Sequence, residues 1–357
     1  MEEDHFIFNM TSRRAILKGL VGLSVLPTLA ACSGSSSPPT AAQPTATRPP
    51  PSPTAGATLY TYQGHSQSVL TLDWSPDGTW VVSGGLDKRV QVWTALKGQR
   101  QVTYSGHSDT VTVVAWAPGG QRIASGSDDT TVQIWQASDG TSLSQFTTGY
   151  ISYVRALGAA WSPDGKRIVF TVTNAAKSSV QLHVVDLGSG KPIAVCQGHN
   201  QDIWSVAWSP DGTRIVSGSQ DKTARVWEAS SGKLLGTYTG HSDVVRSVAW
   251  SPDGKRVVSG GDDKTAQVWD VSTFKKLISY SGHSDSVMGV SWSPDGARLA
   301  SASADTTAQL WDAGSAKMLL TYKGHAKTVN AVKWSPHGGM LASASDDTTV
   351  QVWKGQL

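Results

Sequence analysis

The chain has 357 residues and a formal net charge of +3, with 30 Lys and Arg against 27 Asp and Glu. This balance argues against a general nucleic-acid surface, which carries clustered Lys and Arg. Only two cysteines are present, so a zinc site built from several thiolates is excluded.

Residues 1–31 are predicted to be a signal peptide. Arg13 and Arg14 precede an apolar stretch, residues 15–31, which Lys18 and Pro27 interrupt. Such a stretch is a poor membrane span and is typical of a secretory signal. The acidic residues 1–9 do not suit the basic start of a signal peptide, so we expect translation to begin at Met10.

Two short motifs resemble bacterial export signals. "SRRAILK" resembles the twin-arginine signal, and "LAAC", which ends at Cys32, resembles a lipobox. The resemblance implies export, cleavage before Cys32, lipid attachment to its thiol, and a final location outside the cytoplasm on the cell membrane. The alternative is that Cys32 is an ordinary residue near a plain cleavage site.

Residues 32–57 form a linker rich in Pro, Ser and Thr. This composition cannot bury a core and is predicted to stay disordered or partly extended. It would act as a tether between the lipid and the rest of the chain, residues 58–357.

The remainder of the chain is built from repeats. Gly-His pairs recur, the last four of them 42 residues apart, and a Trp follows each His after 28 residues. A Ser and an Asp stand at fixed positions between them, so six quartets arise. In the order His, Ser, Asp and Trp, these are His65, Ser83, Asp87 and Trp93; His107, Ser125, Asp129 and Trp135; His199, Ser217, Asp221 and Trp227; His241, Ser259, Asp263 and Trp269; His283, Ser301, Asp305 and Trp311; and His325, Ser343, Asp347 and Trp353.

A second motif counts seven units rather than six. "WSPDG" or a close variant begins at Trp74, Trp116, Trp161, Trp208, Trp250, Trp292 and Trp334. The third unit, about 147–190, is degenerate, with Tyr150 at the His position, Phe170 at the Ser position and His183 at the Trp position. We expect about five extra residues in this unit, two before Trp161 and three near Thr173–Lys177.

A period of about 42 residues with Gly-His and Trp-Asp signals is typical of propeller blades, and the chain resembles the WD40 β-propeller family. The resemblance implies an all-β, seven-bladed propeller with four short strands in each blade. The last unit lacks a fourth strand, whereas the start has one to spare. We therefore expect residues 59–62 to pair beside residues 350–353 and close the ring.

The resemblance also implies a structural role for the quartets, in which His bonds Asp and Ser bridges to the Trp indole. An enzyme needs one catalytic constellation, not six identical ones, so no catalytic residues are predicted. No metal site is expected, because His183 and His337 are isolated and the Asp-Asp pairs lack the calcium-loop spacing. No cofactor motif is present, and Cys196 is expected to be packed rather than reactive.

Partner binding is predicted on the face formed by the loops that enter the first strands and by the turns between second and third strands. The resemblance places exposed, variable positions there, among them Leu86, Thr110 and Thr112. The residues predicted to bind a partner are Leu70, Asp128, Asp202, Trp204, Gln220, Arg246, Asp262, Met288, Asn330 and Asp346. Trp and Arg are frequent hot-spot anchors. The alternative is that Trp204 packs against Arg246 and serves only local packing.

Together these features predict a lipid-anchored, non-catalytic, monomeric ring that binds proteins or peptides and does not bind nucleic acid. One alternative is an enzyme or small-ligand binder that uses the central channel, which would need one asymmetric cluster of reactive residues. Another is an oligomerising structural module whose outer strands self-associate.

Overall fold

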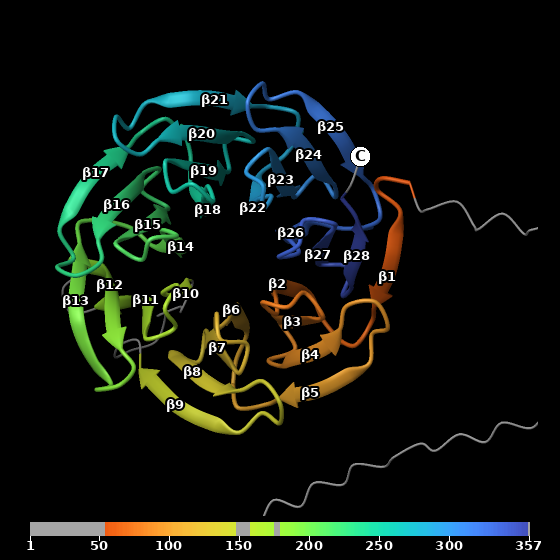
Figure 1. Cartoon of the computed structure of the whole chain (residues 1–357), viewed down its shortest axis with the longest axis horizontal. Helices are drawn as coiled ribbons and strands as arrows, with labels where there is room; N and C mark the ends of the chain where they lie inside the picture. The colour runs from red at the N-terminus through yellow and green to blue at the C-terminus, as the bar shows by residue number, and fades with distance from the viewer. Residues whose placement is uncertain (1–53, 148–157, 175–178, 356–357) are drawn as a thin grey trace, which may run out of the picture. The chain divides into compact units, whose positions relative to one another are not determined.

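The computed structural model describes residues 54–147, 158–174 and 179–355. These residues form seven four-stranded antiparallel sheets arranged as blades around a central axis (Figure 1). The described part contains strands and turns but no helix, so it has no helix that could cross a membrane. The predicted all-β, seven-bladed fold is confirmed. The predictions for Met10, Arg13, Arg14, Cys32 and residues 32–53 lie outside the described residues.

The strands of each blade run from the centre of the ring to its rim, and they follow in sequence except that the outer strand of the last blade comes from the N-terminal part of the described chain. Blade 1 comprises β2 (Val69–Trp74), β3 (Trp80–Gly85), β4 (Val90–Thr94) and β5 (Arg100–Tyr104). Blade 2 comprises β6 (Val111–Trp116), β7 (Arg122–Ser127), β8 (Thr131–Gln136) and β9 (Ser142–Thr147). Blade 3 comprises β10 (Ala159–Trp161), β11 (Arg167–Asn174), β12 (Ser179–Asp186) and β13 (Lys191–Gln197). Blade 4 comprises β14 (Ile203–Trp208), β15 (Arg214–Ser219), β16 (Ala224–Glu228) and β17 (Leu234–Tyr238).

The last three blades repeat this order. Blade 5 comprises β18 (Val245–Trp250), β19 (Arg256–Gly261), β20 (Ala266–Asp270) and β21 (Lys276–Tyr280). Blade 6 comprises β22 (Val287–Trp292), β23 (Arg298–Ser303), β24 (Ala308–Asp312) and β25 (Met318–Tyr322). Blade 7 comprises β26 (Val329–Trp334), β27 (Met340–Ser345), β28 (Val350–Lys354) and β1 (Thr58–Tyr62).

The "SPDG" turns follow from local side-chain chemistry. In blade 5, Ser251 Oγ donates to Asp253 Oδ1 (2.5 Å) and accepts from the backbone N–H of Arg256 (2.9 Å). Gly254 has a φ of +66°, a conformation that residues with a Cβ rarely adopt. Each such turn joins the first and second strands of its blade, so these turns lie on the face opposite the loops that enter the first strands.

The core lies between neighbouring blades. Val258 and Val268 of blade 5 pack with Val287, Trp292 and Leu299 of blade 6 in one buried cluster. Each sheet is covered on both faces, so its inner strands are apolar on both parities and do not alternate with water-facing residues. This arrangement explains the continuous apolar runs at the second and third strands.

The ring is closed as predicted, by β1 pairing with β28. Tyr62 lies opposite Val350 and Thr61 opposite Gln351 in an antiparallel register. The Tyr62 ring also stacks on Trp93 of blade 1, with a centroid distance of 4.3 Å. The N-terminal strand thus completes the sheet of blade 7 and packs against blade 1.

In blade 3 the predicted position of His183 is wrong. Ile168 pairs with Val185 where Ile215 of blade 4 pairs with Trp227, so Val185, not His183, occupies the Trp position. The β11–β12 hairpin is therefore five residues longer than its counterpart, rather than three. Counting residues along the chain placed the Trp position at His183, because the count assumed a shorter hairpin. The pairing of the strands shows that the position belongs to Val185.

Candidate partner-binding site

The six quartets are assembled in the structure with nearly constant geometry. The His Nδ1 to Asp Oδ2 distances are 2.7–2.9 Å, and the His Nε2 to Ser Oγ distances are 2.7–2.8 Å. In five quartets the Trp Nε1–H donates to the Ser Oγ at 2.8–3.2 Å. The quartet of blade 6 differs from the expectation, because Trp311 Nε1 has no acceptor among the described residues; nothing in the structure explains this difference.

The sequence of donors and acceptors determines which atoms carry the protons in a complete quartet. The indole N–H can only donate, so the Ser oxygen accepts it and directs its own hydrogen to His Nε2. The proton of the neutral imidazole is then assigned to Nδ1, which donates to Asp. Every polar atom of this buried chain is satisfied without a charged imidazole, which is the condition for burying such groups at low cost.

Electrostatics supports this assignment. Burial alone would raise the pKa of Asp129 and Asp263, but hydrogen bonds led by those from His107 and His241 outweigh it and hold each pKa at about 2. In other quartets burial lowers the histidine pKa, as at His199. The quartets therefore hold an aspartate anion beside a neutral imidazole.

A tyrosine and a glutamine extend most quartets, and the sequence analysis missed them. In blade 5, Tyr238 stacks on Trp269 with a centroid distance of 4.8 Å and donates to Gln267 Oε1 at 2.6 Å. Tyr238 belongs to the outer strand of blade 4, so this contact joins two blades. At the preceding junction Cys196 replaces the Tyr and Arg225 replaces the Gln. Burial raises the pKa of the Cys196 thiol to about 12. The signal in the sequence was a Tyr three residues before the His and a Gln two residues before the Trp.

The predicted partner-binding residues gather around the mouth of the central channel. A cavity of about 280 Å³ is lined by Leu70, Leu86, Thr110, Thr112, Asp128, Trp204, Arg246, Met288 and Asn330. Six of the ten predicted residues are in this lining. We call this cavity the mouth cavity. Its described lining comes from six blades, because residues 148–157, which include the corresponding loop of blade 3, are outside the described residues.

Two lining side chains are held by acidic residues behind them. Arg246 forms a two-pronged ion pair with Asp262, with Nε–Oδ1 at 2.9 Å and Nη2–Oδ2 at 2.6 Å. Asn330 Nδ2 donates to Asp346 Oδ1 at 2.8 Å. Asp262 and Asp346 therefore position the lining. Asp202 and Gln220 are not part of it, and nine of the ten predicted residues are half-buried rather than exposed, Gln220 being the exception.

Trp204 has a distinctive environment in the mouth cavity. The guanidinium of Arg246 lies over its ring, 4.2 Å from the centroid, as the packing alternative expected. However, its indole N–H is buried and has no acceptor among the described residues. A buried donor without a partner is destabilising unless a ligand satisfies it.

The channel below the mouth cavity has a volume of about 440 Å³. Asp73, Arg246 and Lys333 are the charged residues among the described residues that line it. The pKa of Asp73 is raised, because the effect of burial exceeds the opposing effects of Lys333 and the backbone N–H of Trp116. Asp73 Oδ2 accepts that N–H at 2.8 Å and so ties blade 1 to blade 2. No group of three or more potential metal ligands occurs within residues 54–147, 158–174 and 179–355.

A comparison with known protein families identifies the family of this chain. Six segments match the family model described as WD domain, G-beta repeat, namely residues 56–94, 98–136, 190–228, 232–270, 274–312 and 316–354. The chain belongs to the WD40 repeat family. The unmatched stretch between the second and third segments contains the first three strands of blade 3, the degenerate blade of this WD40 propeller.

Several curated proteins are similar to this WD40 chain. A guanine nucleotide-binding protein subunit beta from Zea mays is 31% identical over 181 residues, which cover 47% of this chain and 46% of the relative. The protein of the same name from Oryza sativa subsp. indica is 30% identical over the same length. A periodic tryptophan protein 2 homolog from Mus musculus is 37% identical over 166 residues, 46% of this chain and 17% of the relative. The match thus spans about half the length of the first two relatives and less of the third.

We expect His241→Ala to destabilise the WD40 propeller by at least about 2 kcal/mol, because it leaves Ser259 and Asp263 without their buried partner. Urea denaturation of the purified chain would measure the change. Ser242→Ala is the matched control, since this neighbouring side chain is exposed, and it should stay within about 0.5 kcal/mol of the wild type. An equal effect of the two substitutions would contradict the structural role of the quartet.

Stability should also fall on acidification. Burial lowers the pKa of His199, His283 and His325, and hydrogen bonding lowers that of Asp129 and Asp263. The unfolded chain binds protons more readily at all five groups. The free energy of unfolding should therefore be level above about pH 7, decrease as the histidines protonate, and decrease again below about pH 4. Urea denaturation at a series of pH values would test this; a rise in stability between about pH 7 and pH 5 would contradict it.

Proposed function

We propose that the protein is a non-catalytic scaffold that binds a partner protein or peptide at the mouth cavity. Support comes first from the family, because WD40 propellers are typically protein-interaction scaffolds. Two of the similar proteins are named as a subunit of a guanine nucleotide-binding protein, which is in keeping with binding to other proteins.

The indole N–H of Trp204, which has no acceptor among the described residues, is the observation that carries the proposal. A peptide carbonyl at the mouth would accept this hydrogen bond and remove the cost of a buried donor. Leu70, Leu86 and Met288 offer an apolar surface beside it. The chemistry that fits is therefore an apolar side chain with an adjacent backbone carbonyl. Arg246, already paired with Asp262, stacks on Trp204 and makes the anchor rigid.

The channel offers weaker support for an enzyme. Asp73 is engaged by the backbone of blade 2, and the other charged lining residues, Arg246 and Lys333, do not form a hydrogen-bonded pair with a nucleophile in the described structure. We also propose that the ring is monomeric, because most of its exposed large apolar side chains are spread over the outer strands of different blades, as at Leu143, Ile193 and Leu277.

The proposal includes export and a lipid anchor at Cys32. It rests on the sequence motifs alone, "SRRAILK" with Arg13 and Arg14, and "LAAC". The Pro-rich residues 32–57 would then connect the lipid to the propeller and allow it to meet partners away from the membrane surface.

Removing the side chains of Trp204 and Arg246 should weaken binding at the mouth cavity. Peptides would be selected from a random displayed library on the full-length protein, and their affinities measured by calorimetry. We expect Trp204→Ala with Arg246→Ala to weaken binding at least about tenfold, while stability stays within about 1 kcal/mol of the wild type. Leu277→Ala, on an exposed outer strand, is the control and should bind normally. Undiminished peptide binding by the double variant would place the docking surface elsewhere.

Membrane attachment should depend on Cys32. Expressed in a bacterium with a lipoprotein pathway, the wild type should fractionate with membranes and carry a lipid mass on its N-terminal cysteine. Cys32→Ala should release the protein from the membrane fraction. Cys196→Ala removes the other cysteine, which is buried, and should leave attachment unchanged. Retention of the Cys32→Ala variant on membranes would contradict the anchor.

A further inference from the structure

Five blade junctions carry the same arginine clasp on the face opposite the mouth cavity. In each, an Arg at the start of a second strand lies over the first-strand Trp of the next blade, 4.8–5.8 Å from the ring centroid. The pairs are Arg122 with Trp161, Arg167 with Trp208, Arg214 with Trp250, Arg256 with Trp292, and Arg298 with Trp334. A guanidinium over an indole is a favourable cation–π arrangement.

Two further groups complete most of these clasps. The first three arginines donate to a carbonyl oxygen in the next "SPDG" turn at 2.9–3.2 Å, that of Gly165, Gly212 or Gly254. The turn aspartate of the same blade lies 3.6–4.0 Å from the guanidinium in four blades, as in Arg214 with Asp211. The niche at a junction thus offers an aromatic face, a carbonyl oxygen and a carboxylate to one guanidinium.

The junction between blades 1 and 2 keeps the niche but not the arginine. Trp80 stands at the arginine position, and none of the cation–π contacts among the described residues involves Trp116. The indole N–H of Trp116 donates to Gly120 O of its own turn at 2.9 Å, whereas Trp161, for example, donates to the neighbouring blade at Ala115 O. This junction therefore lacks two of the contacts that join other blades.

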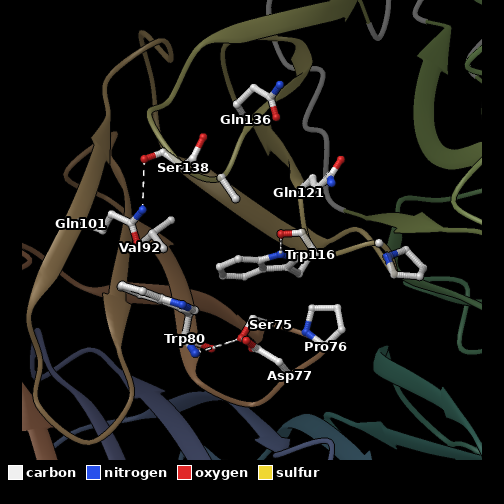
Figure 2. A pocket seen from close by; sticks show the side chains of 14 residues that line it. Ser75, Pro76, Asp77, Trp80, Val92, Gln101, Trp116, Gln121, Gln136 and Ser138 are labelled. Carbon is white, nitrogen blue, oxygen red and sulfur yellow. Dashed lines mark hydrogen bonds between the residues drawn. The ribbon is translucent and has the colours of Figure 1, made fainter. Parts of the chain in front are cut away.

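A pocket of about 640 Å³ opens at this junction (Figure 2). Trp80 and Trp116 form its apolar walls, Asp77 lies at one end, and Gln121 and Gln136 present amide groups at its rim. We call it the two-tryptophan pocket. Gly119 in the turn of blade 2 replaces the usual Asp, so the pocket has Asp77 as its single carboxylate among the described lining residues.

Asp77 has no cationic partner in the described structure, unlike the turn aspartates of blades 3 to 6. Hydrogen bonds from Ser75 and Thr79 lower its pKa, so the carboxylate is charged at neutral pH. Ser75 Oγ lies 2.5 Å from Asp77 Oδ1, which leaves the second carboxylate oxygen for Thr79 and solvent. An ionised, exposed acid beside two indoles favours a cation over a neutral or anionic ligand.

We infer that the two-tryptophan pocket binds the guanidinium of an arginine side chain supplied by a partner polypeptide. Five junctions of the chain show which group suits this niche. Of the two junctions without the arginine, this one keeps the turn aspartate, Asp77, whereas blade 7 has His337 at that position. An arginine fits better than a lysine, because a planar guanidinium can stack on indole while donating to Asp77 and to carbonyl oxygens at the same time. This site lies on the face opposite the mouth cavity and does not depend on the function proposed there.

The test uses three capped tripeptides, acetyl-Gly-X-Gly-amide, in which X is arginine, lysine or citrulline. Binding to the full-length protein would be followed by the NMR shifts of the Trp80 and Trp116 indole N–H groups, assigned with single Trp→Phe variants. We expect the arginine peptide to bind at least about fivefold more tightly than the citrulline peptide, which has the same shape but no charge. Equal binding of arginine and citrulline would overturn the inference and indicate a neutral ligand.

The chain offers a matched pair of variants. Trp80→Arg restores the clasp within the chain, so it should fill the pocket and weaken arginine-peptide binding at least about tenfold, with thermal stability maintained or increased. Met340→Arg adds an arginine at the same position of blade 7 and should leave peptide binding unchanged. Asp77→Asn removes the charge and keeps the size of the side chain, and it should also weaken binding. Unchanged affinity in both Trp80→Arg and Asp77→Asn would overturn the inference.

Discussion

The structure depends on a buried chain of hydrogen bonds that runs from a tryptophan through a serine and a histidine to an aspartate. The imidazoles of the quartets are fully buried at their side chains, and their aspartates are nearly so. Such groups are buried at low cost when each donor meets an acceptor. This requirement explains why the four residue types recur at fixed spacing, and why the tyrosine of the preceding blade packs onto the same tryptophan.

Two departures from the repeat, outside this chain of hydrogen bonds, create the candidate sites. Trp204 places at the mouth cavity a buried N–H that finds no acceptor in the part of the chain that the structure describes. Trp80 replaces an arginine that clasps the next blade at five other junctions and leaves Asp77 and Trp116 without that cation. In both cases the equivalent positions of other blades can be compared, because they show which contacts a side chain makes there within the ring.

Much of the fold could be predicted from sequence, because a repeat reports the same local chemistry many times. The seven "WSPDG" motifs and their variants indicated seven blades, and the spare strand at residues 59–62 indicated how the ring closes. The mouth residues Leu70, Trp204 and Met288 were found by their offset from these motifs. His183 was misplaced, because a hairpin insertion changes register without a signal in spacing. The Arg214 to Trp250 clasp and the two-tryptophan pocket were missed, since they depend on how neighbouring sheets stack.

The protonation of the quartet histidines tests the central claim most directly. Long-range ¹H–¹⁵N NMR of the folded chain at mildly alkaline pH distinguishes the two neutral imidazole tautomers and reports exchange of each ring N–H with water. The account predicts that His65, His107, His199, His241, His283 and His325 carry the proton on Nδ1 and exchange slowly, since Nδ1 donates to a buried aspartate. Protons on Nε2, or rapid exchange at these six rings, would contradict the account.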